Sequence, residues 1–71
     1  MITKEEIKKM IEDMIFKFGI SPAKIADKMR ISVRTLDRWR TGQTEPKLQD
    51  KFYLRQMYRG YAHRLGIKVK K

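Results

Sequence analysis

Apolar residues recur every three or four positions over the first eighteen residues of the chain. They are Ile7, Met10, Ile11, Met14, Ile15 and Phe18, a spacing that forms one apolar stripe along an α-helix. Thr3 stands three residues before Glu6, the spacing of a capping box, in which each side chain bonds the other residue's free backbone N–H. Gly19 follows where a helix end favours positive φ. The pattern therefore predicts a first helix that begins at Thr3 and ends near Phe18.

Two shorter helices are predicted between residues 21 and 41. Ser21 is suited to capping a second helix over 22–29, which starts with proline, a residue whose missing N–H would stay unpaired there anyway. Ser32 is a natural cap for a third helix, over 33 to about 40, and Gly42 ends it. Helices this short are unstable alone in water, so both must pack on a core. The residues expected to face that core are Ile25, Ala26, Met29, Leu36 and Trp39.

From Pro46 onward the pattern predicts a fourth helix that either continues unbroken or divides at Gly60. A helical glycine costs about 1 kcal/mol relative to alanine, which makes a break there plausible. The apolar residues of this segment are Leu48 with Phe52 in one row, and Leu54, Tyr58, Tyr61 and Leu65 in a second. Residues 67–71 are expected to form a frayed basic tail. The fold class is thus all-α, one compact domain of four to five helices over residues 1–71.

Charge divides the chain into two parts. Residues 1–20 hold four bases and four acids, whereas residues 21–71 hold fourteen bases and four acids, which accounts for the whole net charge of +10. A basic footprint concentrated in this way is typical of a polyanion binder. The alternative is a generic solubilising surface.

Several classes of function find no support in the residues. The chain has no cysteine, which excludes disulfides and thiolate metal sites and is compatible with a cytoplasmic location. His63 alone cannot form a zinc site, and neither a histidine-centred triad nor a glycine-rich loop is present, so we expect no cofactor and no enzyme activity. We also expect no membrane span and no secretory signal. A basic amphipathic helix over 46–65 at a membrane surface is disfavoured because its polar and apolar rows are poorly separated.

The run ISPAKIADKMRISVRTLDRWRTGQTEP, from residue 20 to residue 46, resembles the DNA-binding domain of the Cro and phage-repressor family of helix-turn-helix regulators. The matching residues are Ala26 in the first motif helix, the turn Met29-Arg30-Ile31-Ser32, Leu36, Trp39, Gly42 and Pro46. The family's turn usually reads leucine-glycine-valine-serine, so Arg30 stands where the family has a glycine with positive φ. The resemblance implies a lambda-repressor-like domain with its helix-turn-helix at about 21–41.

The resemblance also implies where DNA would be read, with the third helix in the major groove. Its base-reading positions are Val33, Arg34, Asp37 and Arg38. Arginine pairs with guanine O6 and N7, and valine can meet a thymine methyl. Asp37 could accept from cytosine N4 or hold Arg34 or Arg38 in place. The residues expected to contact the DNA backbone are Ser21, Lys24, Arg30, Ser32, Arg40, Thr41, Gln43 and Lys47.

The expected partner is double-stranded DNA, and the expected role is a transcriptional regulator, a repressor that acts by operator occupancy. No small-molecule effector is expected. The tyrosines and arginines of residues 47–66 could complete the core, contact nucleic acid or form a homodimer interface, and we favour the dimer. Two other roles stay open: the DNA-binding component of a phage-type packaging or recombination assembly, and an RNA-binding basic module.

Overall fold

The computed structural model describes residues 2–66, and every regular element in this range is helical. Helix α1 spans Lys4–Glu12 and continues directly into η1, a π-helical turn at Asp13–Lys17. Helices α2 (Pro22–Met29), α3 (Val33–Thr41) and α4 (Leu48–Arg64) follow. Residues 2–66 therefore form the predicted all-α domain, with four helices and no strand in this range. The tail predicted at 67–71 lies outside the described residues.

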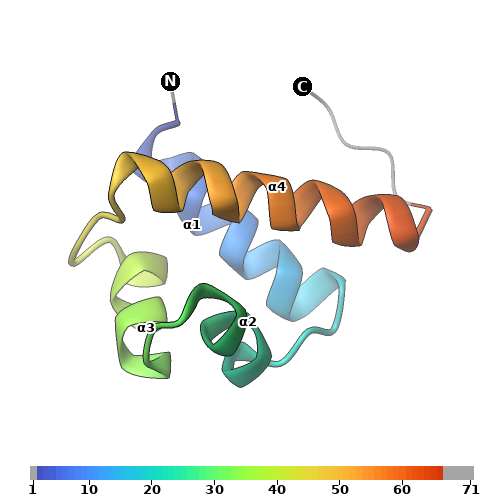
Figure 1. Ribbon diagram of the computed structural model, residues 1–71, viewed down its shortest axis with the longest axis horizontal. Coiled ribbons are helices and arrows are strands. Elements are labelled where there is room, and N and C mark those ends of the chain that lie inside the picture. Colours follow the sequence, from blue (N-terminus) through green and yellow to red (C-terminus); the bar gives the residue numbers. More distant parts are fainter. Residues whose placement is uncertain (1, 67–71) are drawn as a thin grey trace.

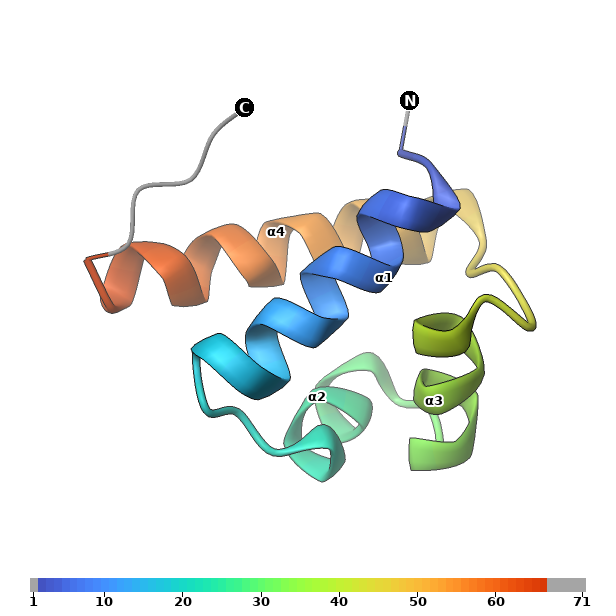
Figure 2. The ribbon, with the colours of Figure 1, turned by 180° about the vertical axis from the view of Figure 1, so that it is seen from behind.

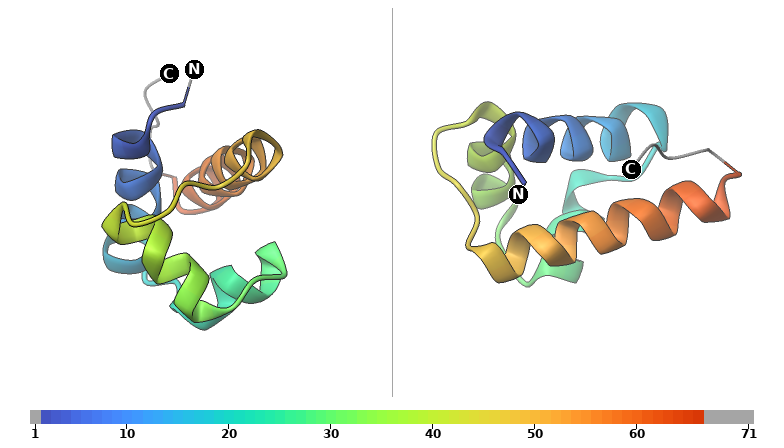
Figure 3. Two further views of the ribbon diagram at one scale, coloured as in Figure 1. Left: turned by 90° about the vertical axis from the view of Figure 1, so that its left-hand side faces the viewer. Right: turned by 90° about the horizontal axis from the view of Figure 1, so that it is seen from above.

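The four helices enclose a single core. Figure 1 shows α4 running along the top of the molecule, with α2 and α3 below it. Helix α1 crosses behind α4, and the reverse view in Figure 2 shows its C-terminal end descending toward α2. Seen from above, α1 and α4 lie side by side, and α2 and α3 close the core from below (Figure 3). This arrangement leaves one face of α3 outside the bundle.

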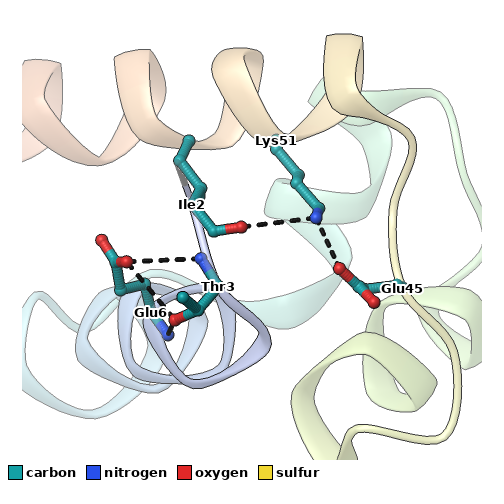
Figure 4. A network of polar contacts seen from close by, with 5 residues as sticks. All are labelled: Ile2, Thr3, Glu6, Glu45 and Lys51. Atoms are coloured by element: carbon teal, nitrogen blue, oxygen red, sulfur yellow. Dashed lines mark hydrogen bonds and ion pairs between the residues drawn. The ribbon is translucent and has the colours of Figure 1, made fainter.

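The start of α1 has the predicted capping box. The Glu6 backbone N–H donates to Thr3 Oγ1 at 3.2 Å, and the Thr3 N–H donates to Glu6 Oε1 at 3.3 Å. Lys51 of α4 joins this end to the rest of the fold, because its Nζ donates to the Ile2 carbonyl at 3.3 Å and to Glu45 Oε2 at 2.5 Å (Figure 4). The bond from Lys51 holds the pKa of Glu45 below its ordinary value.

The end of the first helix differs from the prediction, which was an α-helix as far as Phe18. Residues 13–17 form a π turn instead, and the Phe18 N–H donates to the Asp13 carbonyl, five residues back, at 2.9 Å. Phe16 in this turn is 72% exposed, while the Phe18 ring stacks on Tyr58 with 5.4 Å between centroids. Tyr58 also donates to Asp13 Oδ2 at 3.1 Å. Burial raises the pKa of Tyr58, and its bond to Asp13 raises that pKa further.

The core contains most of the residues that the periodicity assigned to it. The buried cluster consists of Ile2, Ile7, Ile11, Met14, Ile20, Ile25, Ala26, Met29, Leu36, Trp39 and Leu54. Met10, Ile15, Phe18, Tyr58 and Tyr61 pack against it and are partly buried. The expectation that Trp39 belongs to the core is confirmed, since its side chain is 6% exposed.

The last helix begins at Leu48, two residues later than predicted. Of its apolar residues, Leu48, Phe52 and Leu65 lie outside the core, since they are 61%, 55% and 54% exposed. Helix α4 runs through Gly60 without a break. Pro46 is buried but precedes the helix, whose N-cap is Lys47. Leu54, Tyr58 and Tyr61 of the second row contact the core, whereas Leu65 and the row of Leu48 and Phe52 lie on the outside.

The turn between α2 and α3 has the geometry expected of it. Arg30 takes the left-handed conformation, with φ 59° and ψ 41°, and ends α2. The Arg30 N–H donates to the Asp27 carbonyl at 3.1 Å, and the Ile31 N–H donates to the Ala26 carbonyl at 3.0 Å. Ser32 then caps α3 by accepting from the Thr35 N–H at 3.1 Å. A residue with a Cβ is strained in this conformation, so Arg30 stabilises the turn less than glycine would.

Substitution of Arg30 by glycine should therefore stabilise the fold. Arg30→Gly removes a left-handed strain worth roughly 1 kcal/mol, partly offset by the greater freedom of glycine in the unfolded chain. We expect the free energy of unfolding, measured by circular dichroism in urea, to rise by up to about 1 kcal/mol. A loss of stability would show that the Arg30 side chain makes a contact that outweighs the strain.

Truncation of the core-facing leucine of α3 should be costly. Leu36 is 1% exposed, so Leu36→Ala should lower the free energy of unfolding by about 2–5 kcal/mol in the same assay. The matched control is Leu48→Ala, which removes the same atoms from a side chain 61% exposed, and it should change stability by less than about 0.5 kcal/mol. Equal losses in the two variants would contradict the burial pattern.

Candidate nucleic-acid interface

The core contacts of α3 determine which of its side chains face outward. Leu36 and Trp39 are buried, and a period of 3.6 residues places Arg34 and Arg38 on the opposite side of the helix. Both arginines are exposed. Neither makes an ion pair with any residue in 2–66. The outward face of α3 therefore presents two guanidinium groups whose donors are available to a ligand.

Asp37 lies between these arginines in sequence but pairs with neither. Its Oδ1 accepts from Arg40 Nη2 at 2.7 Å, so the suggestion that Asp37 holds Arg34 or Arg38 is wrong. Arg40 also reaches α1, where its Nη1 lies 3.9 Å from Glu12 Oε2. The Arg40 side chain is 32% exposed. Because two carboxylates engage it, this geometry favours a role for Arg40 in holding α3 against α1.

The hydroxyl groups expected near the DNA backbone all make local hydrogen bonds. Ser21 Oγ accepts from the Lys24 N–H at 3.2 Å, and Ser32 Oγ accepts from the Thr35 N–H at 3.1 Å. Thr41 Oγ1 donates to the Asp37 carbonyl at 3.0 Å. Their structural part is therefore to cap α2 and α3 and to close the last turn of α3. All three remain exposed, so each keeps further bonding capacity.

The other residues predicted at the DNA backbone lie on the surface around α2 and α3. Lys24 is on α2 and Arg30 is in the turn; Gln43 and Lys47 are at the two ends of the segment that joins α3 to α4. All four are exposed. Figure 1 shows α2 and α3 as neighbours, with the joining segment beyond the end of α3. The fold thus distributes three cations and one neutral amide on the surface around α2 and α3.

A hollow of about 500 Å³ lies beside the start of α3. Its walls come from η1, the first residue of α2, and α3: Ile15, Phe16, Pro22, Val33, Arg34, Leu36, Asp37 and Arg40. Val33, predicted to meet a base, is 47% exposed there. Phe16 was not predicted to contribute to any site, although one signal was available. It is the one phenylalanine of residues 1–20 outside the apolar stripe.

The described residues 2–66 contain no group of three or more His, Asp or Glu side chains that could hold a metal ion. Within the same range, no helix has both the length and the apolar character needed to cross a membrane. The outward face of α3 offers hydrogen-bond donors and positive charge, and a small apolar area lies beside it at Phe16 and Val33.

Comparison of the chain with protein-family models, with curated proteins and with solved structures yields no match. The structure itself establishes a compact, all-helical domain in which two short helices meet at a tight turn.

The ion pair between Asp37 and Arg40 should contribute little to stability. A double-mutant cycle with Asp37→Ala and Arg40→Ala should give a coupling energy of about 0.2–1 kcal/mol, because the pair is partly exposed. A cycle with Glu12→Ala and Arg40→Ala should give a smaller coupling energy, since 3.9 Å separates Arg40 Nη1 from Glu12 Oε2. Both couplings should weaken in about 1 M salt. A coupling well above this range, or one unaffected by salt, would contradict the exposed geometry.

Proposed function

We propose that this chain is a sequence-specific DNA-binding domain that inserts α3 into the major groove and regulates transcription by occupying an operator. The observation that carries the proposal is the outward face of α3, where Arg34 and Arg38 are exposed and unpaired within residues 2–66. The resemblance of residues 20–46 to Cro and phage repressors supports the same function. The proposed base-reading residues are thus those that the resemblance implies.

The dimensions of α3 suit a major groove. An α-helix with its side chains is about 10–12 Å in diameter, and the major groove of B-DNA, about 12 Å wide, admits one such helix. The helix is capped at its first turn by Ser32 and closed by Gly42, which has φ 80°.

In this arrangement the side chains divide into two groups. Arg34 and Arg38 would read guanine through paired bonds to O6 and N7, and Val33 would meet a thymine methyl. Asp37 would act mainly through Arg40, because its carboxylate already accepts from that guanidinium. Lys24, Arg30, Gln43 and Lys47 would contact phosphates, which supply affinity but no sequence information.

Two further features bear on how the domain would act. Leu48 and Phe52 are exposed one turn apart on α4, which supports the proposal that a second copy packs there. Two copies would read a two-fold-symmetric site with half-sites about one helical turn apart. An assembly role would use the same α4 surface for a different protein, and an RNA-binding role would require preference for RNA over duplex DNA.

The experiment compares Arg34→Ala with Lys47→Ala on a cognate and a random duplex. Loss of a bidentate guanine contact costs about 1–3 kcal/mol of discrimination, so Arg34→Ala should weaken cognate binding by about 5–150-fold and random binding far less. Lys47→Ala should weaken both equally and reduce the salt slope by about one.

Both substitutions are at exposed positions, so the two variants should have the same melting temperature as the unmodified protein. This measurement is the control for folding. Equal loss on both duplexes in Arg34→Ala would refute base reading by Arg34. Tighter binding of RNA than of duplex DNA would refute the proposed function as a whole.

A further inference from the structure

A second hollow lies between the end of α2 and the C-terminal half of α4, separate from α3. Its volume is about 220 Å³, and its walls include Lys28, Tyr53, Gln56, Gly60, Tyr61 and Arg64. Lys28 comes from α2, and the other five residues come from α4. The proposed DNA-reading residues are absent from this hollow, so the function of α3 does not account for it.

The walls of this hollow carry hydrogen-bond donors and no carboxylate. The Lys28 Nζ lies 5.6 Å from the centroid of the Tyr61 ring, a cation–π contact that holds the ammonium at the wall. Tyr53 donates its hydroxyl to the Lys28 carbonyl at 3.2 Å, which fixes the end of α2 against α4. Lys28 of α2 and Gln56 and Arg64 of α4 thus place cationic and neutral donors around the hollow, a set that suits a phosphate group.

Gly60 is unusual because it stands inside a helix of 17 residues. Glycine lowers helix stability relative to alanine, yet a Cβ added at Gly60 would meet no atom within 4 Å. The helix there does not require positive φ either. Packing within the chain therefore gives no reason for glycine, whereas close approach of a ligand to the helix backbone does.

The charge of α4 favours an extended polyanion over an isolated small anion. The one acidic residue of this helix, Asp50, is half-buried, and no exposed position of α4 is acidic. Arg64 lies in the wall of the hollow, and Arg59 is exposed next to Gly60 in the sequence. A neighbouring phosphate of the same strand could contact Arg59 while one phosphate occupies the hollow.

We propose that this hollow binds a backbone phosphate of a second DNA duplex, so that one chain holds two duplexes together. The hollow is lined by residues of α2 and α4 and by none of α3, whereas Arg34 and Arg38 lie on the face of α3 opposite its buried residues. The inference rests on the proposed function, because α3 holds the first duplex. It adds a bridging activity that operator occupancy does not require.

The test measures capture of a fluorescent duplex by protein bound to a second duplex on beads. The decisive variant is Gly60→Glu, which places a carboxylate at the hollow. Its matched control is Gln49→Glu, which makes the same charge change at another exposed position of α4. Gly60→Glu should reduce capture at least about tenfold, and Gln49→Glu should leave it within about twofold. Affinity for the duplex on the beads should stay within about threefold in both variants.

A thermal unfolding measurement serves as the control that the variants are folded. Glutamate is a better helix former than glycine, so Gly60→Glu should unfold a few degrees above the unmodified protein, by about 4–8 °C at most. Loss of bridging in a variant that is more stable would support the site directly. A variant of lower melting temperature would contradict the claim that glycine at position 60 serves a ligand rather than the fold.

Other outcomes overturn the inference. Equal capture by the two variants would mean that bridging uses another surface, such as two copies of α3 in a dimer. Equal loss would mean that only net charge matters. Polyglutamate should block capture less well than unlabelled duplex at equal charge. Equal inhibition by the two competitors would indicate that the hollow binds an acidic protein rather than DNA. Failure of the unmodified protein to stay on the beads would instead contradict the proposed function of α3.

Discussion

The candidate interface depends on the burial of Leu36 and Trp39 beneath α3. These side chains are 1% and 6% exposed, and they belong to the cluster formed by α1, α2 and α4. A helix of nine residues does not stay helical alone in water, so this packing both maintains α3 and orients it. Because Leu36 faces inward, Arg34 and Arg38 must face outward. The same two contacts thus determine stability and the direction in which the charges point.

Ionic contacts refine this arrangement but do not create it. Arg40 connects α3 to α1 through Glu12, and Lys51 connects α4 to the start of α1 and to Glu45. These pairs are partly exposed, so each contributes modestly to stability. Their larger effect is on charge: Asp37 is neutralised by Arg40, whereas Arg34 and Arg38 keep their full positive charge on the outward face. The apolar core therefore positions the interface, and the pattern of ion pairs makes the charge of the outward face of α3 positive.

Much of the fold was predictable because the helix bounds set by local capping residues agree with those that packing of the core requires. Capping by Thr3, Ser21 and Ser32 and the bounds of α2 follow from short-range backbone chemistry, whereas the positive φ at Arg30 was implied only by the resemblance to a family that has glycine there. The π turn was not predictable in this way, since a three- and four-residue apolar spacing is equally compatible with an α-helix. Likewise, the pair Leu48 and Phe52 could face inward or outward until the position of Leu54 in the core was known.

The candidate site was predictable in part, for the same reason. Exposure of Arg34 and Arg38 follows from the helix period, but the partner of Asp37 depends on side-chain geometry three residues away. The hollow beside Gly60 joins residues from α2 and α4, far apart in sequence, which no local pattern indicates. The exposure of Phe16 could be inferred from its place outside the apolar stripe, but its position beside the start of α3 depends on tertiary packing.

The most direct test of the central claim is selection of bound duplexes from a random DNA pool at about physiological salt, where non-specific binding is weak. If α3 reads bases through Arg34 and Arg38, the selected duplexes should share one guanine-containing sequence, and in a dimer it should recur as an inverted repeat about one helical turn apart. Retention of duplexes with no common sequence would contradict base reading. No retention of duplex DNA at all would contradict the account of α3 as a DNA-binding helix.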